Sequence, residues 1–233
     1  MTLSPPTGRP VVVIDDHELF STSLTFTLCA RGFEAVALPL AGLWDVLPTL
    51  PIGNIGLVVL DLDLGEDADG NRINGADLVE GLRQRGWTVL VVTGSTDPTA
   101  IAAAIAAGAV GSVAKAGSLD ELVRTVSAVL RGEQVMTEPE RHEWLERNRR
   151  RAVQDHDLAT RLSRLSPREQ EVLALLTEGM RASAIAMHFV VSMPTVRSQI
   201  RSILVKLQVT SQLEAVAMFH RFSGMSQNSV ERV

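Results

Sequence analysis

Three short, unbroken apolar runs in the first half of the chain constrain its fold most strongly. They are Val11–Ile14, Leu57–Leu60 and Val89–Val92. A run of four apolar residues without polar alternation is typical of a strand buried on both faces, as in parallel sheets covered by helices. Residues 33–38 and 110–114 are weaker candidate strands.

Helix start and stop signals lie between these runs. Gly32 is expected to end the first helix. Asp97 followed by proline predicts a helix start, and Gly108 predicts its end. Ser118, with a glutamate three residues later, predicts a capping box for a helix that ends near Gly132. Five strands alternating with five helices predict a doubly wound α/β domain with a parallel sheet over residues 9–132.

The second half of the chain reads as helical throughout. We expect a polar helical linker over residues 133–163, a small all-α domain over 164–222 and a flexible tail over 223–233. Residues 1–139 contain 8 Lys and Arg against 17 Asp and Glu, a net charge of −9, whereas residues 140–233 contain 14 against 10, a net of +4. This asymmetry indicates two domains and makes the basic one a candidate for nucleic-acid binding, although a solvated helical surface would look the same.

Several classes of protein are excluded by composition. The single cysteine, Cys29, cannot form an internal disulfide or a cysteine-based metal cluster. No apolar run approaches the roughly 20 residues of a membrane span. The first residues lack the pattern of a secretory signal, so we expect a cytoplasmic protein without a membrane partner.

Charged and hydroxyl side chains follow the predicted strands at the point where each strand ends. Asp15 and Asp16 follow the first strand, Asp61 the third, Thr93 the fourth and Lys115 the fifth. Because the carboxyl ends of parallel strands meet at one edge of the sheet, these five side chains are expected to converge there.

This combination suits the capture of a phosphoryl group by a carboxylate. Clustered carboxylates repel one another unless a hard cation lies among them, and Mg²⁺ prefers carboxylate, water and phosphate oxygens. Asp61 would attack the phosphorus to give an acyl phosphate. Lys115 and Mg²⁺ would neutralise charge on the transferring group, and the Thr93 hydroxyl could donate to a phosphoryl oxygen.

Four motifs resemble the receiver domain of bacterial response regulators of the NarL/LuxR type: Val13-Ile14-Asp15-Asp16-His17-Glu18-Leu19-Phe20, Leu60-Asp61-Leu62, Val92-Thr93-Gly94 and Ala114-Lys115. The resemblance implies a flavodoxin-like fold, a sensor histidine kinase as partner and phosphorylation of Asp61. It also implies Asp16 and Asp61 as Mg²⁺ ligands, with Asp15 acting through water and the backbone carbonyl of Asp63 as a third protein ligand.

The chain departs from the receiver pattern in three places. The loop from residue 64 to 75 lacks the family's Met-Pro, is several residues longer than usual and carries extra acids. Ser112 occupies the aromatic switch position, and Ala116 follows the lysine where proline is common. Asp67, Asp69 and Asn71 invite a Ca²⁺-loop interpretation, but the EF-hand spacing fails. An alternative hypothesis is therefore a DNA-binding regulator that needs no phosphorylation and responds to another ligand.

A second alternative is an enzyme. Residues 59–65, Val92-Thr93-Gly94 and Lys115 also resemble the motifs of haloacid-dehalogenase-type phosphatases, in which Asp63 would be the general acid–base. In that family the further acids come after the lysine, whereas Asp15 and Asp16 precede the nucleophile here, and no cap domain is visible. We therefore do not expect an enzyme.

The helical half contains a helix-turn-helix pattern. Ser166-Pro167-Arg168-Glu169 predicts a capped helix that ends at Gly179. A short helix at residues 183–189, a turn at 190–192 and a helix capped by Ser192 and running to about Leu207 follow. Apolar residues lie on one face of that last helix, and Arg197, Ser198, Arg201 and Val205 on the opposite face.

Residues 165–219 resemble the LuxR-type DNA-binding domain, through segments such as Thr195-Val196-Arg197 and Ile203-Leu204-Val205-Lys206-Leu207. The resemblance implies that Arg197, Ser198 and Arg201 face base edges, and that Thr195 and Lys206 hold phosphates. Because one such module reads only a few base pairs, the expected complex is a homodimer on paired half-sites of double-stranded DNA.

Overall fold

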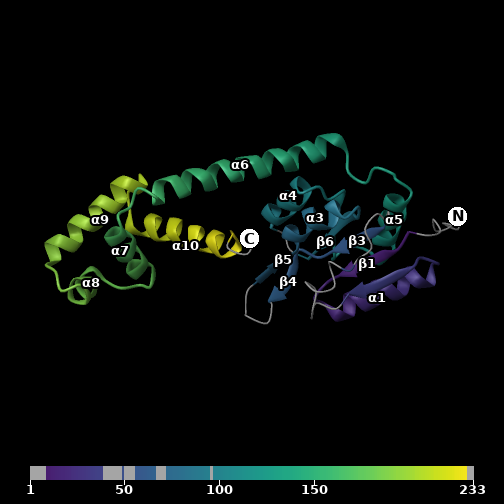
Figure 1. Cartoon of the computed structure of the whole chain (residues 1–233), viewed down its shortest axis with the longest axis horizontal. Coiled ribbons are helices and arrows are strands. Elements are labelled where there is room, and N and C mark those ends of the chain that lie inside the picture. The colour runs from purple at the N-terminus through teal and green to yellow at the C-terminus, as the bar shows by residue number, and fades with distance from the viewer. Residues whose placement is uncertain (1–8, 39–48, 50–55, 67–71, 95–96, 230–233) are drawn as a thin grey trace. The chain divides into compact units, whose positions relative to one another are not determined.

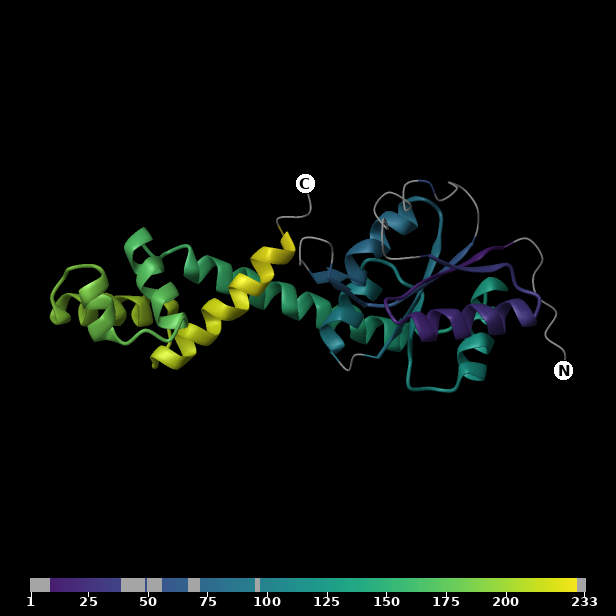
Figure 2. The same ribbon diagram turned by 90° about the horizontal axis from the view of Figure 1, so that it is seen from below.

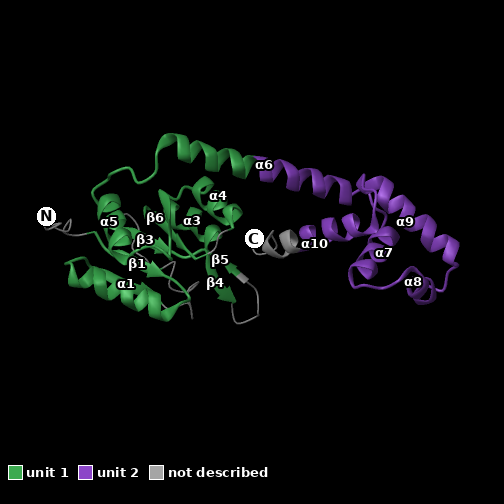
Figure 3. Cartoon of the chain, turned by 180° about the vertical axis from the view of Figure 1, so that it is seen from behind, with its two compact units in different colours: residues 1–149 green, residues 150–233 purple. Residues whose placement is uncertain are grey.

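The structure is a computed structural model and describes residues 9–38, 49, 56–66, 72–94 and 97–229. The chain divides into two compact units, residues 1–149 and 150–233 (Figure 3). Each unit has its own hydrophobic core.

The first unit is built on a five-stranded parallel sheet in the order β2-β1-β3-β6-β7 (Figure 1). The strands are β1 (Val11–Ile14), β2 (Ala35–Leu38), β3 (Leu57–Leu60), β6 (Thr88–Thr93) and β7 (Gly111–Ala114). All five predicted strands are therefore present, and the order matches the flavodoxin-like arrangement. Every residue of β1 and β3 is buried, as their unbroken apolar sequences predict.

Helices cover both faces of this sheet (Figures 1 and 2). Helices α1 (Glu18–Ala30) and α5 (Leu119–Leu130) pack on the face that carries Val11 and Val13. Helices α3 (Gly75–Gln84) and α4 (Pro98–Ala106) pack on the face that carries Val12 and Ile14. The fifth predicted helix falls between β2 and β3, where residues 39–48 and 50–55 lie outside the described residues.

The segment after Asp61 differs from the predicted loop. It forms an antiparallel pair of short strands, β4 (Asp63–Glu66) and β5 (Arg72–Asn74). The sequence Asp-Leu-Gly-Glu carries no strand signal because acids and glycine are depleted in strands. Asp67, Asp69 and Asn71, which prompted the calcium interpretation, lie outside the described residues.

A single 25-residue helix, α6 (Glu138–Leu162), carries the chain from the first unit into the second. At its start, Arg141 donates hydrogen bonds to the carbonyls of Ala109 and Val110, and Trp144 packs on the core beside α4. Near its end, Leu158 and Leu162 are buried in the core of the second unit. The predicted linker is therefore a helix that contributes contacts to both cores.

The second unit consists of the end of α6 and four further helices: α7 (Pro167–Thr177), α8 (Ala182–His188), α9 (Met193–Leu207) and α10 (Gln212–Ser229). Val196, Ile200, Ile203 and Leu207 form the buried face of α9, as their spacing predicts. Helix α10 continues to Ser229, which corrects the tail predicted to begin at residue 223. The tail's polar residues include no proline, so nothing interrupts the propagating helix.

The helix caps were predicted with mixed success. Asp97 and Ser192 each accept a backbone hydrogen bond, and Ser166 forms a complete capping box with Glu169. The capping box at Ser118 is wrong, because its side chain makes no capping hydrogen bond although the residue does occupy the cap position. None of the helices in the described part of the chain is long and apolar enough to cross a membrane.

Candidate functional site

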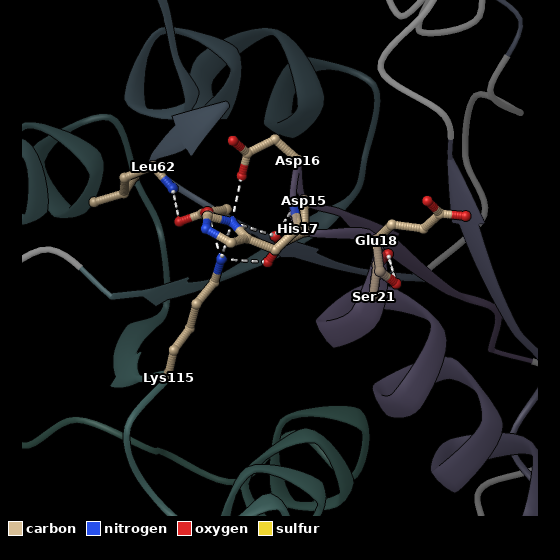
Figure 4. A network of polar contacts seen from close by, with 8 residues as sticks. Asp15, Asp16, His17, Glu18, Ser21, Leu62 and Lys115 are labelled. Atoms are coloured by element: carbon tan, nitrogen blue, oxygen red, sulfur yellow. Dashed lines mark hydrogen bonds and ion pairs between the residues drawn. The ribbon is translucent and has the colours of Figure 1, made fainter. Parts of the chain in front are cut away.

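The carboxyl edge of the sheet brings the predicted acidic residues together (Figure 4). Asp15 and Asp16 follow β1 directly, and Asp61 follows the neighbouring strand β3. Ligand atoms of Asp15, Asp16, His17 and Asp61 all lie within 4.8 Å of one another. The cluster occupies the position between β1 and β3 where the direction of strand order reverses, which is where sheets of this kind bind ligands.

Lys115 closes the cluster from the end of β7. Its ammonium nitrogen lies 2.6 Å from Asp15 Oδ2 and 2.5 Å from Asp61 Oδ2. Its backbone N–H donates to the carbonyl of Thr93, a buried residue at the end of β6, at 3.0 Å. Side chains from the ends of β1, β3 and β7 are thus in direct contact, and Thr93 lies beside them at the end of β6.

Burial and charge shift the pKa values of the two central groups in the same direction. Desolvation is the largest influence on Asp61 and raises its pKa, assisted by the charge of Asp15 and opposed by Lys115. Burial lowers the pKa of Lys115, but its hydrogen bonds to Asp15 and Asp61 and their charges outweigh this and raise it. Lys115 therefore stays an ammonium ion and supplies a fixed positive charge beside Asp61.

Backbone groups hold the Asp61 carboxylate in place. The side chain is 2% exposed, and its Oδ1 accepts a hydrogen bond from the backbone N–H of Leu62 at 2.7 Å. The backbone of Asp63 also hydrogen-bonds to it and lowers its pKa. A Cβ on Gly75 would lie 1.9 Å from the carbonyl oxygen of Asp61, so only glycine fits where α3 begins.

Sequence reasoning missed one member of the cluster, His17. Its Nδ1 lies 2.5 Å from Asp16 Oδ1 and 3.3 Å from Asp15 Oδ1, and its backbone N–H donates to Asp15 Oδ1. Lys115 Nζ lies 3.4 Å from the same ring nitrogen. Its position directly after the Asp15-Asp16 pair was the available signal, because the residue that follows a strand end shares its edge of the sheet.

The donor set fits a hard divalent cation. Asp61 is buried, whereas the Asp16 side chain is 27% exposed and contacts His17, and Lys115 pairs with Asp15 and Asp61. Three carboxylates face one ammonium ion, which leaves an excess of negative charge. Carboxylate oxygens at a solvent-accessible edge are the ligands that Mg²⁺ prefers. Asp16 and Asp61 are therefore the side chains suited to hold it.

The second unit presents a polar face on α9. Thr195, Arg197, Ser198 and Arg201 are all exposed, on the side opposite the buried apolar residues. In the part of the chain that the structure describes, no ion pair involves Arg197 or Arg201. The Thr195 hydroxyl lies 2.8 Å from that of Ser192 at the helix start. The short helix α8, a tight turn and the longer helix α9 give the arrangement of a helix-turn-helix.

Lys206 is placed differently from the other candidate nucleic-acid contacts. Its ammonium nitrogen lies 2.6 Å from Oε2 of the buried Glu169, which also accepts hydrogen bonds from the Ser202 hydroxyl and the Ser166 N–H. Burial raises the pKa of Glu169, but these hydrogen bonds outweigh that effect and lower it to about 2. Lys206 thus links α9 to α7 through a partly buried ion pair.

Comparison with known proteins assigns both units. Residues 11–127 match the response regulator receiver domain, and residues 163–219 match the bacterial regulatory proteins of the luxR family. The nitrate/nitrite response regulator protein NarP of Escherichia coli is 30% identical over 215 residues, which cover 90% of this chain and 93% of NarP. The chain is a response regulator of the NarL/LuxR type.

Other relatives align with the response regulator over a similar length. The nitrate/nitrite response regulator protein homolog of Haemophilus influenzae is 28% identical and covers 90% of this chain and 95% of its own. The transcriptional regulatory protein FixJ of Bradyrhizobium diazoefficiens is 28% identical, with 91% and 94% covered. A structure of full-length FixJ from B. japonicum is 24% identical, covers 94% of this chain and 98% of its own, and has a TM-score of 0.43.

The family is one of DNA-binding transcription regulators, not of enzymes. Asp61 and Lys115, which prompted the phosphatase alternative, are in contact in the structure, and both lie within the residues that match the receiver domain.

Proposed function

We propose that this response regulator is phosphorylated on Asp61 by a sensor histidine kinase and then binds paired half-sites of double-stranded DNA as a dimer. The observation that carries the proposal is the buried Asp61 carboxylate with Lys115 Nζ 2.5 Å from its Oδ2, at the edge of the receiver sheet. A buried nucleophile with a fixed cation beside it is prepared for phosphoryl transfer.

The chemical step follows from these contacts. A carboxylate oxygen of Asp61 forms the bond to phosphorus while the bond from phosphorus to the donor's nitrogen breaks, and the donor leaves as a neutral imidazole after protonation. Lys115, kept protonated by Asp15 and Asp61, stabilises the negative charge on the transferred group. Thr93, buried at the adjoining strand end, is proposed to donate its hydroxyl to a phosphoryl oxygen.

Divalent metal binding is part of the proposal. Asp16 and Asp61 would hold Mg²⁺, with Asp15 acting through water and the backbone carbonyl of Asp63 as a further ligand. When bound, Mg²⁺ supplies charge neutralisation between the carboxylates and the incoming phosphoryl oxygens. Asp15 contributes by orienting Lys115 and the His17 backbone, since its two oxygens contact both.

The exposed face of α9 is the proposed DNA-reading surface. Arg197, Ser198 and Arg201 would face base edges in the major groove, where an arginine pairs bidentately with guanine. Thr195 at the helix start is proposed to contact a phosphate. Lys206 is also assigned a phosphate contact by resemblance, and its ion pair with Glu169 means that it would have to serve both partners.

The decisive experiment is the intact mass of the full-length protein after incubation with acetyl phosphate and Mg²⁺. We expect the wild type to gain one phosphoryl group and the Asp61→Asn variant to gain none. The asparagine side chain keeps the shape of the aspartate but cannot act as the nucleophile. Circular dichroism of both proteins checks that the substitution leaves the fold intact.

A second candidate function has its own supporting observation. Ser112 occupies the position in β7 where the family usually has an aromatic switch residue, and the segment after Asp61 forms an additional hairpin. A folded wild type that gains no phosphoryl group would favour a phosphorylation-independent regulator. A wild type that gains a phosphoryl group but binds DNA with the same affinity before and after would favour the same alternative. In that case Asp61 would still accept the phosphoryl group, but phosphorylation would not control DNA binding.

A further inference from the structure

The outward face of α9 contains an apolar residue among its polar ones. Val205 is 71% exposed, whereas the other valine of this helix, Val196, is fully buried. Successive residues of a helix are rotated by about 100°, so Val205 lies between Arg201 and Ser198 when the helix is viewed along its axis. The valine side chain therefore points in the same direction as the stripe of residues that faces away from the core, one turn beyond Arg201 towards the end of α9.

Folding of the second unit gives no reason for a valine at this position. Valine forms helices less readily than alanine, lysine or arginine, and an exposed valine gains no burial. Single exposed apolar residues are common on protein surfaces, so exposure alone is not informative. The informative feature is which residues share this face of α9 with Val205, because they form the proposed DNA-reading surface.

The arginines of this stripe differ from several others in the unit, although Arg150, Arg164 and Arg181 likewise take part in no ion pair among the described residues. Along α6, Arg151 pairs with Asp155 and Arg161 with Asp157, so those cations are partly neutralised within the helix. Arg197 and Arg201 take part in no ion pair within the described residues. Two such cations on one exposed face suit an anionic partner, and a partner that covers Arg201 and extends one further turn along α9 also covers Val205.

The chemistry of the major groove then specifies what Val205 would meet. Among the four bases, only thymine presents an apolar group there, its C5 methyl. A helix rises about 1.5 Å per residue, so Val205 lies roughly 6 Å along the axis from Arg201, which is about two base steps of 3.4 Å.

We propose that Val205 is a specificity-determining residue that contacts a thymine methyl group about two base pairs from the base that Arg201 contacts. This inference rests on the proposed function, because it assigns one further contact to the same DNA-reading surface. It predicts a half-site in which a guanine and a thymine are separated by a fixed spacing.

The test uses the full-length protein and the removal of single methyl groups from DNA. Binding sequences are first selected from random duplexes with wild-type protein treated with acetyl phosphate and Mg²⁺. Each thymine of the selected half-site is then replaced by uracil, which differs only by the missing methyl. We expect one thymine per half-site at which uracil weakens wild-type binding about fourfold, the equivalent of one buried apolar carbon.

Two variants identify the side chain responsible. Val205→Ala should bind the thymine and uracil duplexes equally well, and its stability should be unchanged or higher because alanine is the better helix former. Val153→Ala is the matched control, since Val153 is also an exposed helical valine, at 63%, but lies on α6. It should retain the full response to uracil.

The outcomes separate this proposal from the proposed function. Arg201→Ala should bind the selected site more weakly but keep its response to uracil. If the wild type selects a sequence yet no uracil substitution distinguishes it from Val205→Ala, the valine contact is refuted and the function stands. If no sequence is selected with or without acetyl phosphate, both the function as proposed and the valine contact are refuted.

Discussion

The turn between α8 and α9 contains a backbone conformation that its residue does not favour. Val190 has φ of 53°, in the left-handed region, and its side chain is 91% exposed. Its N–H donates to the carbonyl of Met187, and the next N–H donates to that of Ala186, which is the hydrogen-bond pattern of a Schellman helix end. Among the described helices, five others have glycine with positive φ at that position: Gly32, Gly86, Gly108, Gly132 and Gly179.

We predict that Val190→Gly stabilises the second unit. A non-glycine residue in the left-handed region costs about 1–2 kcal/mol, and a β-branched one lies at the upper end. Glycine adds roughly 0.5–1 kcal/mol of conformational entropy to the unfolded chain, which offsets part of the gain. The exposed valine side chain contributes little burial, so the free energy of unfolding should rise by about 1 kcal/mol, or the midpoint by roughly 4–8 °C.

Thermal unfolding of the full-length protein measures this change. All three tryptophans, at positions 44, 87 and 144, precede residue 150, so their fluorescence reports on the first unit. Circular dichroism also follows the helical second unit. Val190→Gly should raise the dichroism transition without moving the fluorescence transition.

The matched control is Val153→Gly, which makes the same change at an exposed valine inside a right-handed helix and should lower stability by a few tenths of a kcal/mol. A Val190→Gly variant that loses as much stability as this control would refute the strain argument.

Two further predictions concern the first unit and the α7–α9 ion pair. Gly75→Ala places a Cβ 1.9 Å from the Asp61 carbonyl oxygen, so it should destabilise the first unit by about 2 kcal/mol or more. Urea unfolding followed by tryptophan fluorescence measures this change. The control is Gly81→Ala, which has open space around its Cβ and should be neutral or stabilising. The pKa of Glu169 is about 2 in the folded state, below its usual 4.5. The ionised carboxylate therefore stabilises the fold above about pH 5, by at most about 3 kcal/mol. This stabilisation is lost as the pH falls towards 2. Hydrogen exchange of α7 and α9 should therefore show a loss of protection in that window which Glu169→Gln does not show.

The parts of the fold that were predictable are those in which burial dictates the residue type. Strands β1 and β3 are covered on both faces, so all four residues of each must be apolar, and the same holds for Val89–Val92 in β6. The convergence of Asp15, Asp61 and Lys115 was predictable because strand order alone fixes which ends share an edge.

The hairpin β4–β5 and the role of His17 were not predictable in the same way. Backbone pairing between Asp63 and Asn74 holds the hairpin, and backbone pairing does not require particular residue types that could be recognised in the sequence. The Ser118 capping box failed because a favourable sequence does not fix the side-chain rotamer of the cap residue. The position of His17 after Asp16 places it at this edge of the sheet, but the Asx-type hydrogen bond from its backbone N–H to Asp15 is a local contact that only the structure reveals.

Lys206 shows why the structure changes how DNA-binding variants must be interpreted. The residue looks like a phosphate contact, but its ammonium group compensates the carboxylate of Glu169, which lies 37 residues away in sequence. Replacing Lys206 leaves a buried carboxylate without its cation, so a loss of DNA affinity would combine a missing contact with a displaced α9. Arg197 and Arg201 have no such internal partner among the described residues, so loss of DNA affinity in their alanine variants can be assigned to the contact itself.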